Sequence, residues 1–239
     1  MLEGARVAVV VPAHNEARLI RKTLCGIPAF VDHVVVVDDA SEDDTAQRVR
    51  ALDDPRVELV RHRDNRGVGA AIATGYSRAF GAGADVAAVM AADAQMHPDD
   101  LTALVRPVLR AEADYAKGDR LSHPEAISAM PLGRLVGNHV LTRLTRLATG
   151  LDVTDSQCGY TALGRSAYGA LRLRWVWPRY GYPNDLLSRA AVAKLRVRDV
   201  VVRPIYADER SGIRPHHLVT SFPAVLALGL FRRVRQLAA

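Results

Sequence analysis

The chain has 239 residues, of which 49% are hydrophobic and 24% charged, the composition of an ordinary globular protein. This composition excludes a disordered tail, a collagen-like repeat and a disulfide scaffold, and the length predicts one large domain or two small ones. Cys25 and Cys158 form no CxxC pair, so no zinc or redox motif is predicted. The N-terminus lacks a signal-peptide layout, and the apolar run 222–231 is shorter than the ~20 residues of a membrane-spanning helix. We therefore expect a soluble, cytoplasmic protein.

Charge is distributed unevenly along the chain, whose net charge is +6. Residues 1–119 carry 14 Lys and Arg against 19 Asp and Glu, a net −5, whereas residues 120–239 carry 18 against 7, a net +11. This asymmetry indicates two chemically different tasks within one fold. Nearly all the basic residues are arginines, whose planar guanidinium suits phosphate and carboxylate. No DNA- or RNA-reading motif occurs, so nucleic acid is not an expected partner.

Apolar runs typical of buried strands alternate with helical patterns through the first half of the chain. The runs are residues 6–12, 32–38, 57–61, 85–90 and 113–117. The helices are predicted at residues 16–26, 42–52, 67–81 and 98–110, with Ser41 as the N-cap of the second. This alternation predicts βαβ units and an α/β fold with an open, largely parallel sheet. In such sheets ligands bind beyond the carboxyl ends of the strands.

Polar segments follow each predicted strand. They are PAHNE at 12–16, DDASEDD at 38–44, RDNRGVG at 63–69, AADAQMHP at 91–98 and GDR at 118–120. Because the carboxyl ends of parallel strands meet at one edge of a sheet, these carboxylates, amides and glycines are predicted to gather along one rim. A single such segment is often only a turn or a helix cap, but their succession at consecutive strand ends indicates a ligand site.

This array resembles the family 2 glycosyltransferases of GT-A fold, in particular the dolichol- or polyprenol-phosphate sugar synthases. The resemblance covers roughly residues 6–215 and rests on VPAHNE, VDDAS, NRGVGAA, DAQMHP, GDR and DSQCGY. It implies a single GT-A domain at 1–215, with a nucleotide-sugar-binding half at 1–119 and an acceptor-side half at 120–215. A C-terminal amphipathic helix at 216–239 would follow. The implied partners are a UDP- or GDP-sugar, Mg²⁺ or Mn²⁺, and a lipid-phosphate acceptor.

The resemblance assigns the nucleotide-sugar site to twelve residues. They are Pro12, Ala13, Asn15, Glu16, Asp38, Asp39, Gly69, Ala92, Asp93, Arg120, Arg210 and Arg214. Segment 12–16 is expected to line the nucleoside pocket, and the Asp38 and Asp39 carboxylates to accept hydrogen bonds from base and ribose. Asp93 is expected to bind the metal beside the diphosphate, with Gln95 as its partner. Oxygen ligands favour Mg²⁺ or Mn²⁺ over zinc.

The sequence departs from the family pattern at two positions. Ala91 stands where relatives commonly have a further aspartate, and Val68 where many have a lysine. The first change predicts weaker metal binding, or metal binding that depends on the phosphates of the donor. Arg120 is expected to face the donor sugar and phosphates, and Arg210 and Arg214 to close over the diphosphate, because guanidinium–phosphate contacts are strong.

The acceptor determines whether a catalytic base is needed. A phosphate acceptor is already an anion at neutral pH and needs none, whereas a hydroxyl acceptor requires one. The candidates are Asp185 and, less favoured, Asp155, which in relatives more often holds the acceptor side of the cleft together. Asp185 follows Asn184 where many family members have a Glu-Asp pair, so at most one carboxylate of that pair remains.

Two segments of the basic half have amphipathic patterns. In residues 131–149 the apolar stripe consists of Leu132, Leu135, Val136, Val140, Leu144 and Leu147. This stripe either lies at the membrane near the lipid site, as in similar proteins, or packs into the core. Residues 220–237 combine apolar positions with Arg232, Arg233 and Arg235. That helix either binds an anionic membrane surface or docks on the domain or on a second subunit of a homo-oligomer.

The leading interpretation is an inverting glycosyltransferase that moves a sugar to a polyprenyl phosphate at the cytoplasmic membrane face. Two alternatives remain. The same fold could act on a soluble hydroxyl acceptor such as a natural product or glycan. The chain could also be a catalytically weakened nucleotide-sugar-binding protein, because Ala91 and the single Asp185 thin out the acidic residues of the site.

Overall fold

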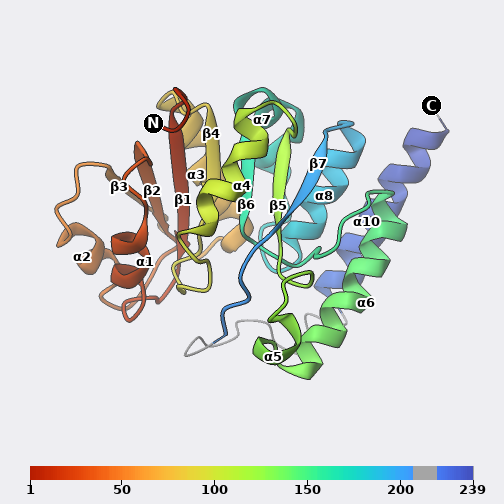
Figure 1. Ribbon diagram of the computed structural model, residues 1–239, viewed down its shortest axis with the longest axis horizontal. Helices are drawn as coiled ribbons and strands as arrows, with labels where there is room; N and C mark the ends of the chain where they lie inside the picture. Colours follow the sequence, from red (N-terminus) through yellow and green to blue (C-terminus); the bar gives the residue numbers. More distant parts are fainter. Residues whose placement is uncertain (207–219, 239) are drawn as a thin grey trace.

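The computed structural model describes residues 1–206 and 220–238 (Figure 1). Its strands are β1 (Val7–Ala13), β2 (His33–Asp38), β3 (Val57–Arg61), β4 (Val86–Val89), β5 (Tyr115–Asp119), β6 (Thr161–Gly164) and β7 (Val197–Val201). Its helices are α1 (Ile20–Gly26), α2 (Thr45–Arg50), α3 (Val68–Gly81), α4 (Asp100–Leu109), α5 (Ala126–Ala129), α6 (Leu132–Thr149), α7 (Arg165–Leu171), the 3₁₀ turn η1 (Leu173–Trp175), α8 (Tyr182–Val192) and α10 (Ser221–Leu237).

The seven strands form one sheet in the order β3-β2-β1-β4-β6-β5-β7. All neighbouring pairs are parallel except those made by β6, which runs antiparallel to both β4 and β5. The predicted α/β fold with an open, largely parallel sheet flanked by helices is therefore confirmed. Neither the antiparallel β6 nor β7 has a counterpart among the predicted strands. The four residues of β6 are too few to show a period in the sequence.

The sheet is buried on both faces, which explains the continuous apolar runs of its central strands. All seven residues of β1 are buried, and alternate ones belong to different cores. Val9 packs in one core with Leu104 of α4, and Val10 packs in the other with Ile72 of α3 and Leu186 of α8. Figure 1 shows α4 in front of the sheet and α3 and α8 behind it.

The predicted start of the second helix was wrong by three residues, because α2 begins at Thr45. Ser41 is not its N-cap, since the Ser41 hydroxyl accepts the amide of Asn15 at 2.9 Å. The carboxylate of Asp43 instead accepts the amides of Ala17 and Thr45, both at 3.0 Å. A turn fixed by Asp43 therefore separates β2 from the helix.

The fifth strand lies two residues further along the chain than predicted, because Gly118 and Asp119 belong to β5 and not to the turn after it. Gly118 is a strand residue that is covered closely. A Cβ atom there would lie 2.9 Å from the Cys158 sulfur and 3.0 Å from the Tyr160 carbonyl oxygen. The glycine thus allows the segment before β6 to pack directly on β5.

Candidate functional site

The segments after β1, β2, β4 and β5 meet at one edge of the sheet, the lower edge in Figure 1, as strand polarity requires. We call this edge the carboxyl-end rim. The structure brings Glu16 and Asp93 within electrostatic reach of each other there, from turns that are far apart in the sequence. The predicted gathering of polar side chains along one rim thus has a geometric basis.

The turns after β1 and β2 are bound to each other by a set of hydrogen bonds. The Asn15 side-chain oxygen accepts the Glu42 amide at 2.9 Å, and the Glu16 amide donates to the Thr45 hydroxyl at 2.9 Å. The His14 ring bonds the Asp39 carbonyl at 2.9 Å. The Asn15–Ser41 and Ala17–Asp43 bonds described above belong to the same set. Asn15 has a φ of 55°, which asparagine tolerates better than most residues. These bonds join the two turns into one hydrogen-bonded unit.

Glu16 is the titratable group of this unit whose pKa is raised most clearly. Burial, together with the nearby carboxylates of Asp93 and Asp43, raises its pKa to about 7. Glu16 is therefore about half protonated near neutral pH. The protonated form can donate a hydrogen bond to a ligand, and a bound cation would favour the charged form.

Asp38 and Asp39 are almost fully buried, and each of their oxygens already accepts a hydrogen bond from the protein. Asp38 accepts the Ser41 amide at 2.9 Å and the Arg61 guanidinium at 2.7 Å. Asp39 accepts the His62 ring at 2.6 Å and the backbone amides of residues 66 and 67 at 2.9 and 2.7 Å. Both carboxylates therefore shape the neighbouring turns, and a base or ribose would share them through the remaining lone pairs.

Gly69 lies where another segment of the chain packs so closely that a side chain would not fit. Its amide donates to the Pro178 carbonyl at 2.8 Å, and a Cβ atom at this position would overlap the Trp177 carbonyl oxygen. The glycine-rich turn before α3 thus seats the segment that leads into α8. Sequence reasoning missed this contact because the two segments are more than 100 residues apart.

The turn after β4 carries the two candidate metal ligands. Asp93 accepts the Gln95 amide at 3.1 Å, and the side-chain nitrogen of Gln95 donates to the Ile205 carbonyl at 3.1 Å. Over residues 1–206 and 220–238, no three His, Cys, Asp or Glu side chains cluster as a metal site. The oxygens of Asp93 and Gln95 therefore fit a hard divalent cation only if oxygens of a bound ligand complete its coordination.

Arg120, which follows β5, is held by Asp155 in a two-pronged ion pair. The Arg120 Nε lies 2.8 Å from one Asp155 oxygen and Nη2 lies 3.1 Å from the other, while Nη1 donates to the Tyr206 hydroxyl at 3.2 Å. Burial raises the pKa of Asp155, but the Arg120 charge outweighs it and holds the pKa below its usual value. Asp155 is fully buried, so this anion orients Arg120 and has no exposed oxygen with which to take a proton.

Asp185, in the first turn of α8, is enclosed by two further arginines. Its oxygens accept Arg189 at 2.8 Å, Arg232 at 2.5 Å and the Trp177 amide at 2.8 Å, and the residue is 1% exposed. Arg189 follows four positions later on the same helix, a spacing visible in the sequence, whereas Arg232 comes from α10. As placed, Asp185 joins α10 to α8 and has no exposed oxygen for an acceptor.

Comparisons with known proteins identify the family of the chain. The family model for glycosyl transferase family 2 matches residues 8–172. The chain belongs to this family. It is 31% identical over 217 residues to the UDP-N-acetylglucosamine--dolichyl-phosphate N-acetylglucosaminyltransferase of Methanococcus voltae, with 84% of this chain and 86% of the relative covered. It is 29% identical to the polyprenol monophosphomannose synthase of Mycolicibacterium smegmatis, with 86% of this chain and 78% of the relative covered.

The fold of this glycosyltransferase matches solved GT-A structures. Glucosyl-3-phosphoglycerate synthase from Mycobacterium tuberculosis, solved with Mn²⁺, UDP-glucose and phosphoglyceric acid, aligns with a TM-score of 0.71 at 25% identity. The alignment covers 96% of this chain and 80% of that one. The family and the fold together make the chain a glycosyltransferase with a GT-A sheet.

The exposure of the side chains on α6 tests the two alternatives for its apolar stripe. The buried residues of this helix are Thr142, Thr145, Ala148 and Thr149. Five of the six stripe residues face outward, with Leu132 75%, Val136 54%, Val140 53%, Leu144 43% and Leu147 63% exposed, and Leu135 is half-buried. The alternative that this stripe packs into the core is therefore wrong.

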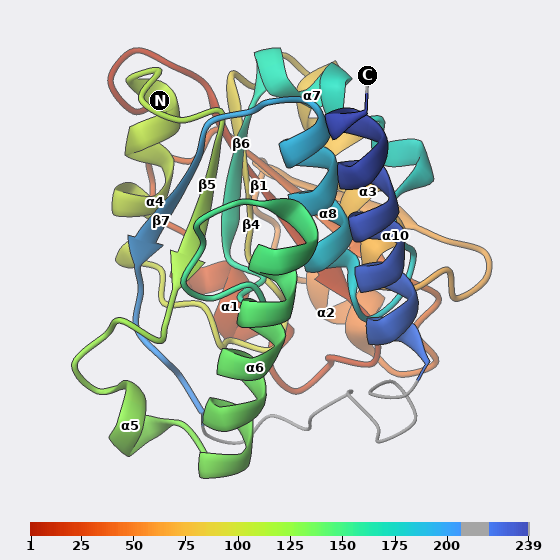
Figure 2. The same cartoon turned by 90° about the vertical axis from the view of Figure 1, so that its right-hand side faces the viewer.

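Helix α10 docks on the domain, with Phe222, Val225 and Gly229 buried against its neighbours. Figure 2 shows α10 beside α8 and α6. Its opposite side exposes Leu230, Phe231, Val234 and Leu237. No helix among the described residues is long and apolar enough to cross a membrane. Arg210 and Arg214 lie outside the described residues.

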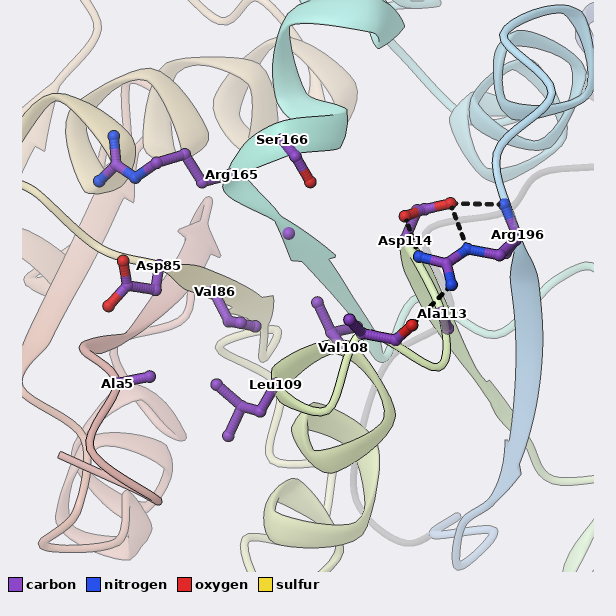
Figure 3. Close-up of a pocket in the computed structure, with 12 residues that line it drawn as sticks. Ala5, Asp85, Val86, Val108, Leu109, Ala113, Asp114, Arg165, Ser166 and Arg196 are labelled. Carbon is purple, nitrogen blue, oxygen red and sulfur yellow. Dashed lines mark hydrogen bonds and ion pairs between the residues drawn. The ribbon is translucent and has the colours of Figure 1, made fainter.

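A cavity of about 400 Å³ lies at the opposite edge of the sheet, where β4 and β5 begin (Figure 3). Its charged groups are paired within the protein. Asp114 accepts Arg196 at 2.8 and 3.1 Å, Asp85 accepts the Arg6 amide at 2.8 Å, and Arg165 donates to the Phe80 carbonyl at 3.1 Å. These pairs fix the turns between strands and helices, so the cavity is separate from the carboxyl-end rim.

Proposed function

We propose that this glycosyltransferase transfers a sugar, with inversion, from a UDP- or GDP-sugar to a polyprenyl phosphate at the cytoplasmic membrane face. The observation that carries the proposal is the state of Asp155 and Asp185. Both candidate bases are buried and bound to guanidinium groups. An acceptor that is already an anion needs no base, whereas a hydroxyl acceptor would have to lose its proton to one.

In this mechanism a phosphate oxygen of the acceptor attacks the anomeric carbon from the face opposite the departing nucleoside diphosphate. The bond between the anomeric carbon and the diphosphate oxygen breaks, and its electron pair leaves with the diphosphate. Arg120 would stabilise this charge, since Asp155 orients its guanidinium beside the rim. A Mg²⁺ or Mn²⁺ ion held by Asp93 and Gln95 would neutralise the diphosphate further.

The nucleoside would lie on the unit formed by the β1 and β2 turns. Pro12, Ala13, Asn15 and Glu16 are proposed to line it, with Asp38, Asp39, Gly69 and Ala92 shaping the pocket. Arg210 and Arg214 are proposed to approach the diphosphate. The relatives named for dolichyl phosphate and polyprenol support the lipid acceptor, and the neighbour solved with Mn²⁺ and UDP-glucose supports the donor and the metal.

Contact with the membrane is proposed through two neighbouring helices. The exposed apolar residues of α6 and α10 given above form what we call the α6–α10 face. Neither helix contains an Asp or Glu, while together they contain six arginines. Apolar side chains flanked by arginines suit the interface of an anionic bilayer, where each basic residue contributes about 1 kcal/mol.

A soluble hydroxyl acceptor is the second candidate, because the neighbour of similar fold was solved with phosphoglyceric acid. A weakened nucleotide-sugar-binding protein is the third, because Ala91 provides no metal ligand. A thermal-shift titration with UDP, GDP and their sugars, with and without Mn²⁺, tests the donor site. A melting temperature raised by one nucleotide and raised further by Mn²⁺ is expected, since ligands stabilise the state they bind. No shift at millimolar nucleotide would contradict the proposal, and binding without product would favour the third candidate.

A further inference from the structure

Two ionisable residues face each other on neighbouring strands of the sheet and take no part in the proposed transfer step. Lys117 lies in the middle of β5 and is fully buried, and its partner across the parallel pair is Asp199 of β7. Burial lowers the pKa of Lys117 and raises that of Asp199. A lysine and an aspartate in such places are costly unless their polar atoms are bonded, so their contacts indicate why they are present.

Both side chains bond the same short segment, residues 154–158, at its two ends. The Lys117 ammonium donates to the Cys158 carbonyl at 2.5 Å. Asp199 Oδ2 accepts the Thr154 amide at 2.5 Å and the Thr154 hydroxyl. The other Asp199 oxygen is buried and has no hydrogen-bond partner among the residues that the structure describes. The two charges therefore fix the segment from β5 and β7.

Between these two ends lies Asp155, the anion that orients Arg120. Asp155 Oδ1 also accepts the amides of Gln157 and Cys158, both at 3.1 Å, so the segment folds around its carboxylate. The segment also packs closely on β5, as the 2.9 Å spacing between a Cβ at Gly118 and the Cys158 sulfur indicates. The anchoring of the segment thus determines where the Arg120 guanidinium points.

We infer that Lys117 and Asp199 are positioning residues of the transfer reaction, which clamp residues 154–158 so that Asp155 holds Arg120 toward the donor. The inference rests on the proposed function for the role of Arg120 at the diphosphate. The clamp itself is a property of this fold and can be measured without any substrate.

The kinetic test is a double-mutant cycle between Lys117→Met and Arg120→Ala. In the wild-type background Lys117→Met is expected to lower kcat/KM about 10-fold or more, since small displacements of a catalytic group cost this much. In the Arg120→Ala background it should lower kcat/KM less than about 2-fold, because both changes act through one guanidinium. Arg198→Met, which removes an exposed cation next to Asp199, is the matched control and should leave kcat/KM unchanged. Equal losses in both backgrounds would overturn the inference.

A substrate-free test uses the Nε–H proton of Arg120, observed by NMR and assigned with Arg120→Lys. Its bond to the buried Asp155 should protect this proton from exchange in the wild type. Protection should fall at least 10-fold in Thr154→Val and Asp199→Ala, and Asp199→Asn should restore it in part because an amide oxygen still accepts from Thr154. Thr154 is exposed, so this variant folds even if Lys117→Met does not. Unchanged protection in Thr154→Val and Asp199→Ala would overturn the inference, whether or not the protein transfers a sugar.

Discussion

The proposed donor side and the proposed acceptor side of this glycosyltransferase are held together by different interactions. On the donor side, the turns after β1 and β2 are joined by short hydrogen bonds between backbone amides and the side chains of Asn15, Ser41 and Thr45. On the acceptor side, Asp155 and Asp185 are joined to arginines 35 and 47 positions away in the sequence, Arg120 and Arg232. The first side is organised mainly by hydrogen bonds to backbone amides, and the second mainly by arginine–carboxylate ion pairs that include partners on different elements.

This difference predicts that the acceptor side responds most strongly to loss of a charge. Removing one partner of a buried ion pair leaves the other charge buried and uncompensated. On the proposed donor side, removing a carboxylate from a turn is expected to affect ligand binding more than the free energy of unfolding. The following variants separate the two effects.

The largest effect on stability is expected for Asp185→Ala, which leaves Arg189 and Arg232 without their carboxylate. The free energy of unfolding should fall by about 3–5 kcal/mol, measured by urea denaturation. Asp152→Ala is the matched control, because Asp152 is 87% exposed in its pair with Arg146 and should cost less than about 0.5 kcal/mol. An Asp185→Ala protein of unchanged stability that has lost all transfer would indicate a catalytic base instead.

The largest effect on activity is expected for Asp93→Asn. It should lower kcat on the order of 100-fold or more, because the leaving diphosphate loses charge stabilisation. The free energy of unfolding should change little, since Asp93 lies in a turn at the rim. The converse variant, Ala91→Asp, should tighten Mn²⁺ binding, measured by calorimetry with UDP or GDP present. Full activity of Asp93→Asn would remove Asp93 from the metal site.

Membrane binding should depend on the α6–α10 face. The double variant Val140→Asn and Leu144→Asn should weaken binding to anionic vesicles about 100-fold or more, since each apolar side chain contributes about 1.5–3 kcal/mol when it is buried. Both residues are exposed, so urea denaturation should show unchanged stability. Thr220→Ala, outside the face, serves as the control. Unaltered sedimentation with vesicles, or a change from dimer to monomer, would assign the face to another partner.

A smaller effect is expected for Glu16→Gln. The raised pKa of Glu16, about 7 against 4.5 in the unfolded chain, means that the folded state binds more protons between these values. The contribution of Glu16 to stability is therefore lost as pH rises toward 7. At pH 8 the glutamine variant should be more stable than the wild type by about 1 kcal/mol, after allowance for solvent around a half-exposed group. The difference should vanish near pH 4.5, and a constant difference across this range would contradict the assignment.

The difference between the two sides also explains how much could be predicted from the sequence. Strands β1 to β5 and the rim followed from apolar runs and from the polar segments after them, because these signals are local. The pairing of Asp155 with Arg120 and that of Asp185 with Arg232 could not be predicted, since tertiary contacts select these partners from 29 arginines. The stripe on α6 was visible as a period, but a period does not say which side faces inward. Here threonines and alanine pack inward and the leucines and valines face outward.

The most direct test of transfer without a catalytic base compares two acceptors that differ only in the phosphate. With the preferred nucleotide sugar and Mn²⁺, the protein is supplied with a short-chain polyprenyl phosphate or with the corresponding polyprenol, and the glycosylated lipid is measured. We expect product from the phosphate and none from the alcohol, because Asp155 and Asp185 are both bound to arginines. Transfer to the alcohol at a comparable rate would show that a base is at work and would contradict this expectation.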